Sequence, residues 1–532
     1  MNNQAPAAVR GGDHANRKIA ICILCLWILS SCTLPSSAPP SNGSGQNFLL
    51  VTPDPSALPT STPFQPAGAV LAPPEATLIA TFTPLPPTDT PLPTLAFTAT
   101  SLALPTSPAP AARTQYTIFA ILDYAGHQLA ADETIRYTNQ TGVALSELLL
   151  AVPANLEGGF TPEHIVLDGQ ALNFDLSGQR LTVSLPQPLA PNAQAALAMR
   201  FRISIPPKPK EHPYGYDVDQ VNLTDWYPFV VPYDNGWILH EPSSWGEYLV
   251  YDSSDFEVNI KTTQTGIVIA ASGIGEPNGE WTRYRLSGGR TFALSASDQF
   301  LVLDAVAGGA AIRSYYYPGY EDQGLAILNA AVRAIGLFET QFGPFPYESL
   351  SIIQADVNDG QEYDGLVFLG TKFYNEYDGS ARSNLVAIGV HEIAHQWWFG
   401  LVGSDQAMEP WLDEALCIYS EEIFYRFIYP NSHDWWWNFR VNYFGPTGYV
   451  DSTIYEAASF RAYVNASYLN GANFLEALNF RMGDDAFFQF LRDYASRYAR
   501  GHASGYDFFA VARQNTTEDI SDLINAYFKG SY

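Results

Sequence analysis

The stretch His391-Glu-Ile-Ala-His395 decides the fold and chemistry of this chain, together with Glu414, which follows His395 after 18 intervening residues. Side chains four residues apart lie on one face of an α-helix, so a helix here presents two imidazoles to a single point. A carboxylate from a second segment completes a His, His, Glu set. This set binds zinc and leaves the fourth position of a tetrahedral ion for water, which is typical of a catalytic site.

The flanking residues predict two helices joined by a loop. The apolar run from Asn384 to Val390 favours a buried helix that carries both histidines. A glycine-containing loop is expected at 400–405, and Pro410 marks a turn or the start of the helix that carries Glu414. The alternative is an ordinary helix with two solvated or core histidines. The third ligand and its helical context favour the zinc site.

Bound zinc lowers the pKa of its water toward ~7, so that a hydroxide-like nucleophile exists at neutral pH. A neighbouring carboxylate must then accept the proton of that water and pass it to the leaving amine. Glu392 lies beside the two histidines and is placed for this general base and acid role.

Two segments carry a resemblance to a known family. The decapeptide HEIAHQWWFG (391–400) and the pentapeptide WLDEA (411–415) resemble the zinc core of the aminopeptidase N family of gluzincin metallopeptidases. The resemblance covers roughly residues 200 to 532. It implies peptide substrates, a thermolysin-like catalytic domain and one zinc ion, with His391, His395 and Glu414 as its ligands.

The same resemblance implies two further site residues. The family's Tyr-x-Lys-Gly motif supplies a tyrosine that stabilises the oxyanion, and Tyr468 matches it, with Asn470 in place of the lysine. The family's Gly-x-Met-Glu-Asn strand supplies a glutamate that holds the free amine of the substrate. Glu362 falls on that glutamate, and Gln361 replaces the methionine. These two departures leave the zinc chemistry intact and bear on aminopeptidase specificity.

Other residues near the motif are weaker candidates. Asp413 adjoins a ligand and stands where the family usually has Asn. Glu421 and Glu422 are expected to be structural or solvated. The run Trp435–Trp437 lines a substrate cleft or packs in the core, with packing the more common role of such clusters. Glu241 is a speculative second contact for the amine.

Three functions remain open on the sequence. The first is a zinc aminopeptidase that removes N-terminal residues from extracellular peptides. The second is an endopeptidase on the same site, because a cleft without further domains admits longer chains. The third is a lipoprotein that binds peptides on an inactive scaffold, which the intact set of site residues disfavours.

The first 113 residues have the composition of an export signal and a tether. Arg17 and Lys18 precede an apolar segment, 19–29, too short for an ordinary spanning helix, and Leu29-Ser-Ser-Cys32 resembles a bacterial lipobox. The expected result is a lipidated Cys32 that anchors the protein to the outer face of the membrane; a plain signal anchor is the alternative. Residues 33–113 hold 18 of the 38 prolines, which predicts a disordered tether.

The net charge bears on the binding partners of the protein, and the cysteine content bears on its disulfides. The net charge of −27 argues against nucleic acid and against an anionic membrane surface as partners. Cys417 is the only cysteine after residue 32, so no intramolecular disulfide is expected in the folded part. We expect it to be a buried small hydrophobe.

The expected fold class is α+β with several domains. Alternating segments such as 117–122 and 198–205 predict an N-terminal antiparallel β sandwich or saddle at 114–305. Helical periodicity then takes over, and residues 306–532 are expected to form the mainly helical zinc-peptidase domain. The predicted signal, 1–32, and the tether, 33–113, precede both.

Overall fold

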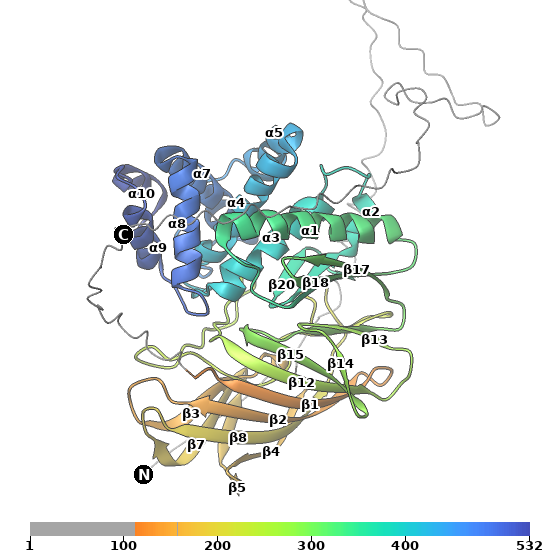
Figure 1. Cartoon of the computed structure of the whole chain (residues 1–532). Helices are drawn as coiled ribbons and strands as arrows, with labels where there is room; N and C mark the ends of the chain where they lie inside the picture. Colours follow the sequence, from red (N-terminus) through yellow and green to blue (C-terminus); the bar gives the residue numbers. More distant parts are fainter. Residues whose placement is uncertain (1–111, 157) are drawn as a thin grey trace, which may run out of the picture. The chain divides into compact units, whose positions relative to one another are not determined.

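Alternating burial builds the first half of the protein from strands. The computed structural model describes residues 112–156 and 158–532 (Figure 1). In β1, every second side chain from Tyr116 to Leu122 is buried, as expected for a strand with one face on a core. An eight-stranded sheet has the order β14-β15-β12-β1-β2-β8-β4-β5. Its strands are β1 (Gln115–Asp123), β2 (Gln128–Thr138), β4 (Phe160–Leu167), β5 (Gln170–Ala171), β8 (Gln194–Ser204), β12 (Ser254–Thr262), β14 (Glu276–Asn278) and β15 (Trp281–Gly289).

Two four-stranded sheets complete this β half. The backbone N–H of Val230 donates to the Tyr116 hydroxyl, which ties β11 to the eight-stranded sheet. One small sheet contains β3 (Leu145–Ala151), β6 (Phe174–Ser177), β7 (Arg180–Leu189) and β11 (Phe229–Val230); the other contains β9 (Gly215–Tyr216), β10 (Val221–Leu223), β13 (Val268–Ala271) and β16 (Leu294–Ser297). The expected β domain is therefore confirmed. Its pairing is antiparallel except between β1 and β12, which run parallel.

A five-stranded sheet begins the second half. Its order is β17-β18-β19-β21-β20, and β20 lies at one edge. The strands are β17 (Leu301–Ala307), β18 (Ala310–Tyr316), β19 (Ser349–Ala355), β20 (Gly360–Tyr363) and β21 (Leu366–Gly370). The domain boundary expected at 305/306 falls inside β17. This strand pairs with β18 and therefore belongs to the second half of the protein.

Helices cover this sheet and fill the rest of the second half, as the α+β fold class requires. Figure 1 shows the long α1 lying beside the strands β17 and β18. Gly389 allows α1 and α3 to approach closely, because a Cβ at this position would lie 2.2 Å from Ile327 Cδ1. The helices are α1 (Glu321–Phe342), α2 (Thr371–Glu376), α3 (Asn384–His395), α4 (Trp411–Ile428), α5 (His433–Trp436), α6 (Phe460–Tyr463), α7 (Asn470–Met482), α8 (Asp484–Arg497), α9 (Gly505–Gln514) and α10 (Ser521–Tyr527).

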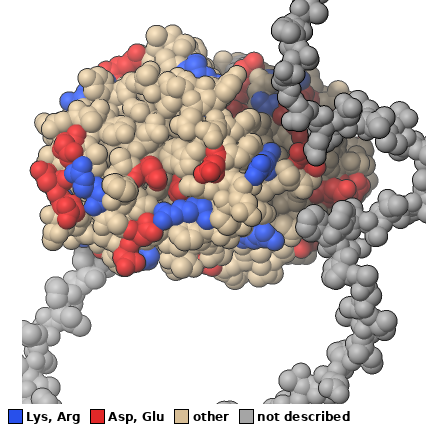
Figure 2. Space-filling view, turned by 90° about the horizontal axis from the view of Figure 1, so that it is seen from above, with Lys and Arg blue, Asp and Glu red and all other residues tan. Residues whose placement is uncertain are grey.

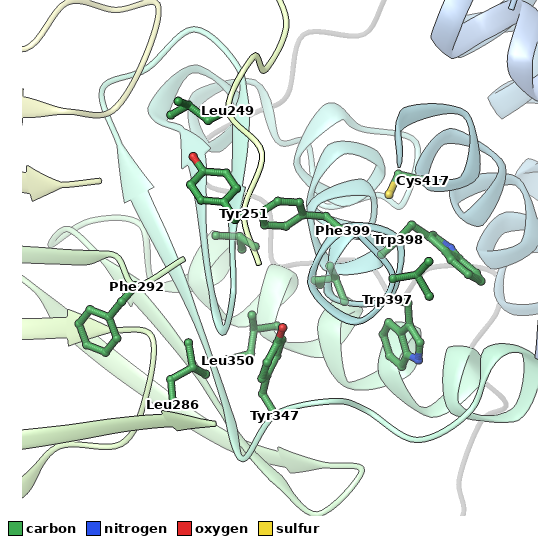
Figure 3. Packing of buried hydrophobic residues seen from close by; sticks show 14 of the residues in the cluster. Leu249, Tyr251, Leu286, Phe292, Tyr347, Leu350, Trp397, Trp398, Phe399 and Cys417 are labelled. Atoms are coloured by element: carbon green, nitrogen blue, oxygen red, sulfur yellow. The ribbon is translucent and has the colours of Figure 1, made fainter. Parts of the chain in front are cut away.

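Buried polar contacts join the two halves behind the zinc helix. The Arg290 guanidinium donates to the carbonyl oxygens of Tyr251, Phe399 and Gly501. The backbone N–H of Arg290 donates to Asp364 at 2.9 Å, and the Tyr347 hydroxyl also donates to this carboxylate. Tyr251 and Phe399 lie close together here (Figure 3). Their rings are nearly perpendicular, and the ring centroids are 6.2 Å apart. This junction fixes the end of α3 against the β half.

The N-terminal expectations lie outside the described residues. They concern the signal at 1–32, the lipidated Cys32 and nearly all of the tether. Within 112–156 and 158–532, no helix has both the length and the apolar character needed to cross a membrane. On the face drawn in Figure 2, Lys and Arg side chains are scattered among Asp and Glu.

Candidate metal centre and active site

Two helices bring the three predicted ligands together. The hydroxyl of Ser383 caps α3 by accepting from Val386 N–H, and α3 then runs through both histidines. Glu414 lies in the first turn of α4, where the helix dipole favours a carboxylate. Glu414 Oε2 lies 3.2 Å from His391 Nε2 and 3.7 Å from His395 Nε2. Donor atoms on a tetrahedral zinc are roughly 3.3 Å apart, so the three side chains fit one ion.

The outer nitrogen of each histidine faces a second carboxylate. His395 Nδ1 lies 2.5 Å from Asp413 Oδ1, and His391 Nδ1 lies 3.2 Å from Glu421 Oε1. The contact of His395 is a hydrogen bond, whereas that of His391 is an ion-pair distance without hydrogen-bond geometry. Carboxylates in these places orient the rings with Nε2 toward a metal. Asp413 is therefore part of the centre, as the sequence suggested. Glu421 was expected to be either structural or solvated. It is not solvated, because its side chain is fully buried and lies against the metal ligand His391.

Burial and mutual repulsion of carboxylates around this point favour a bound cation. Burial raises the pKa of four carboxyl groups well above their usual range, and neighbouring carboxylates raise it further. These groups are Glu362, Glu392, Asp413 and Glu414. Burial also lowers the pKa of His395, which favours the neutral imidazole that binds metals. A divalent cation held by two histidines and Glu414 opposes the carboxylate repulsion.

Glu392 is buried with one oxygen unpaired. Within the described residues, nothing hydrogen-bonds Glu392 Oε2. Its other oxygen approaches Gly360 at the start of β20, where a Cβ would lie 2.1 Å from Oε1. A buried carboxylate with a free oxygen beside a metal site is ready to accept a proton from water. Gly360 was not predicted as a site residue, since this contact joins segments 32 positions apart.

Tyr468 packs beside His391. Its ring lies parallel to the His391 imidazole at a centroid distance of 6.2 Å, and its hydroxyl hydrogen-bonds Glu414. Burial raises its pKa well above the usual range, and Glu414 adds to this, so Tyr468 stays a protonated donor. Asn470, which replaces the family's lysine, donates to the Gly448 carbonyl at 2.8 Å.

A pair of glutamates borders the centre at the edge strand. Glu362 on β20 is buried, and its Oε2 accepts from Gln361 Nε2 at 2.9 Å. The same amide lies 3.3 Å from Glu247 Oε1. Carboxylate oxygens of Glu247, Glu362 and Glu414 lie within 4.8 Å of one another. Glu247 is thus the second acidic partner of Glu362.

Among the described residues, Glu241 is not one of the carboxylates that gather at Glu414. Glu241 is exposed and contributes its carbonyl to the Tyr455 hydroxyl. The chain reaches the site six residues later, after Gly246. This glycine has a φ of +74°, and a Cβ there would lie 2.7 Å from Ile454 Cγ2.

Gln396 holds the edge strand to the zinc helix. Its Oε1 accepts from the Gly365 N–H at 2.8 Å, and its Nε2 donates to the Tyr363 carbonyl at 3.1 Å. Gln396 directly follows His395. Glu362 therefore keeps a fixed position relative to both histidines.

The remaining candidates are the tryptophans at 435–437, Glu422 and Cys417. Trp436 is fully buried, and its indole N–H donates to Glu421 Oε2 at 2.8 Å. It therefore packs in the core, whereas Trp435 and Trp437 are only half-buried. Glu422 lies 2.6 Å from His433 Nε2, consistent with a structural role. Cys417 is buried, as expected.

The sequence of the helical half is similar to a known family of peptidases. Residues 327–527, from α1 to α10, match the peptidase family M1 domain. This part of the chain is therefore similar to the domain that defines peptidase family M1. Together with the fitted donor set, that similarity makes zinc the metal of the centre.

Relatives of the M1 domain come from plants, fungi and an archaeon. Aminopeptidase M1-B of Oryza sativa subsp. japonica is 27% identical over 236 residues, which are 42% of this chain and 27% of the relative. Probable aminopeptidase 2 of Sulfurisphaera tokodaii is 23% identical over 224 residues, 39% of this chain and 28% of the relative. The chain thus spans little more than a quarter of the length of these relatives.

Solved structures agree on the two-part fold. A variant of the M1 zinc metallopeptidase from Deinococcus radiodurans superposes with a TM-score of 0.60 at 18% identity, covering 79% of this chain and 95% of that chain. A two-domain M1 zinc metallopeptidase bound to L-tryptophan gives 0.60 at 17% identity, covering 79% and 95%. The β half and the helical half therefore recur together in these proteins.

We predict that Gly360→Ala slows turnover without loss of zinc. The new methyl group would occupy the place of the Glu392 carboxylate and displace it, and a misplaced catalytic group costs on the order of 10²-fold in rate. Steady-state kcat and zinc content measure the two effects. Gly336→Ala in α1 is the control, because nothing lies within 4 Å of its added Cβ. A wild-type kcat in Gly360→Ala would contradict the assigned position of Glu392.

Proposed function

We propose that the protein is a zinc aminopeptidase that hydrolyses the N-terminal residue of peptides. The observation that carries this proposal is the carboxylate pair Glu247 and Glu362 beside the metal ligand Glu414. An ammonium group forms hydrogen bonds of about 2.8 Å to carboxylates, so one ammonium spans two oxygens that lie within 4.8 Å. A free α-amine is the part of a peptide that carries this charge.

The position of the pair relative to the metal favours removal of a single residue. The α-amine and the carbonyl carbon of one residue are only two bonds apart. A substrate held by its amine at Glu247 and Glu362 therefore places its first carbonyl near the ligands of the metal. Internal cleavage needs chain on both sides of the scissile bond, and the acidic pair lies where the preceding residue would have to pass. This geometry favours the aminopeptidase over the endopeptidase.

Each remaining residue has a role in hydrolysis. Zinc held by His391, His395 and Glu414 would supply a Lewis acid and lower the pKa of a water molecule at the site. Glu392 accepts a proton from the attacking water at its free Oε2 and delivers it to the leaving amine. Tyr468 donates its hydroxyl proton in a hydrogen bond to the developing oxyanion. Glu247 and Glu362 hold the amine so that the carbonyl is correctly placed.

A structural neighbour supports this choice of substrate class. A variant of the Deinococcus radiodurans M1 zinc metallopeptidase, of the same fold, has been solved with the substrate Tyr-Ser-Ala, which has a free amine. The intact set of Glu392, Tyr468 and three ligands also argues for an active enzyme over a peptide-binding scaffold.

Glu392→Gln is expected to lower kcat by 10²- to 10⁴-fold, about the usual contribution of a general base, while zinc content stays near one ion per chain. The amide keeps the shape of the side chain and cannot accept the proton. Hydrolysis of an aminoacyl-arylamide and elemental analysis provide the two measurements. Glu376→Gln, at an exposed position on α2, serves as the control. Retained turnover in Glu392→Gln would remove this residue from the mechanism.

Glu247→Gln and Glu362→Gln are each expected to raise KM for free-amine peptides by roughly 10- to 100-fold, since a hydrogen bond to a charged group contributes about 1.5–3 kcal/mol. N-acetylated versions of the same peptides should be poor substrates of the wild type and insensitive to both changes. Glu241→Gln is the matched control, because this exposed glutamate belongs to the same segment as Glu247. Equal cleavage of free and acetylated peptides by the wild type would favour the endopeptidase.

We also propose that Cys32 is lipidated and that residues 33–113 tether the enzyme to the outer face of the cell membrane. The support is the sequence alone: the lipobox-like Leu29-Ser-Ser-Cys32 and the proline-rich composition that follows. Its substrates would then be extracellular peptides.

Mass spectrometry of the mature protein tests this anchor. We expect the first residue to be Cys32 carrying acyl chains, and we expect Cys32→Ser to move the enzyme from the membrane fraction to the soluble fraction. Cys417→Ser is a control that alters a buried cysteine of the M1 domain. A mature N-terminus that retains the residues before Cys32 would exclude lipidation and favour a plain signal anchor.

A further inference from the structure

The carboxylate behind His391 is held by a single neighbouring segment. Glu421 lies two turns after Glu414 on α4, and its Oε1 approaches His391 Nδ1 at 3.2 Å. Arg440 Nη2 donates to the same oxygen at 2.6 Å, and Arg440 Nε donates to Oε2 at 2.8 Å. The Trp436 indole N–H also donates to Oε2 at 2.8 Å. Both oxygens of Glu421 therefore have fixed positions.

The contact between Arg440 and Glu421 is largely buried. The Glu421 side chain is 0% exposed and the Arg440 side chain 18% exposed. A two-point contact between a guanidinium and a carboxylate fixes the carboxylate plane as well as its place.

The segment that supplies Arg440 presents one face to α4. His433, Trp436 and Arg440 are spaced by three and four residues, which places them on the same side of α5 and of the π-helical turn at Trp437–Val441. His433 contacts Glu422, and the other two contact Glu421. π-Helical turns are often found at functional sites. Here the turn contains Arg440.

The two histidines receive different support. The carboxylate behind His395 is Asp413, whose second oxygen accepts from the neutral amide of Gln406 at 2.7 Å. The carboxylate behind His391 is held by a cation. We propose that Arg440 is a positioning residue of the zinc centre: it acts through Glu421 to hold His391 in the orientation that binds the metal. The tryptophan run at 435–437 serves this function through Trp436.

Release of zinc tests the role of Arg440. The zinc-loaded full-length protein is mixed with an excess of a chromogenic chelator, and the release rate is followed by absorbance. Arg440→Met is expected to release zinc about 10- to 100-fold faster, the usual cost of removing an outer partner of a metal ligand. Arg426→Met is the matched control. Arg426 lies on α4 itself, at the end remote from Glu414, and its Nη2 pairs with Asp484 Oδ2 of α8 at 2.6 Å. Its release rate should remain within twofold of the wild type.

Thermal midpoints separate positioning from general stability. If Arg440 only stabilises the fold, Arg440→Met lowers the midpoint of the zinc-loaded and metal-free forms equally, and their difference stays unchanged. If Arg440 positions His391, the difference shrinks. In a Glu421→Gln background, the Arg440→Met change should accelerate release little further, because its route to His391 is already broken.

A conservative variant guards against misfolding. Arg440→Lys keeps the charge and loses the two-point geometry, so its release rate should lie between those of the wild type and Arg440→Met. Should Arg440→Met fail to fold, the comparison of Arg440→Lys with Arg426→Lys decides the matter. Wild-type release in a folded Arg440 variant, or equal acceleration in the Arg426 variant, overturns the proposal. The assay uses no substrate, so a chain that holds zinc but cleaves no peptide would refute the proposed function alone.

Discussion

Burial of several carboxylates around one point is the constraint on which the active half depends. Glu362, Glu392, Asp413 and Glu414 are all at most 6% exposed. Ionised carboxylates in such a place repel one another and lose their hydration, which costs several kcal/mol per ion unless a cation compensates. Two neutral imidazoles and a divalent ion supply that compensation. The metal is thus a condition for the charge state of the whole cluster as well as the centre of the chemistry.

A rigid frame has to hold groups that would otherwise separate. Gln396 ties the end of the zinc helix to the edge strand that carries Glu362, and Arg290 ties the same region to the β half. Each contact satisfies buried backbone groups that would be costly to leave unpaired. The strand, the helix and the β half therefore keep their relative positions before any substrate binds. The proposed amine site is therefore preformed, and a preformed site loses little entropy on binding.

Sequence reasoning succeeded where the relevant contacts are local. Helical spacing places His391 next to His395, and the apolar run before them predicted a helix that indeed begins at Asn384. It failed where distant segments meet. Glu247 and Gln361 are 114 positions apart, and no local pattern encodes their contact. Arg440 looks like a surface arginine until α5 folds back on α4. The burial of Glu421 follows from the same packing, which explains why it was expected to be solvated or structural.

The replacement of the family's methionine by Gln361 fits the charge problem at the amine site. Glu247 and Glu362 repel each other when no ammonium lies between them. The Gln361 amide lies within reach of both, at 3.3 Å and 2.9 Å, and places a donor between the two carboxylates. A methionine offers no such donor. The departure that weakened the resemblance on the sequence thus supplies, in the folded chain, a reason why two acidic side chains can stay close together while they await a cationic substrate.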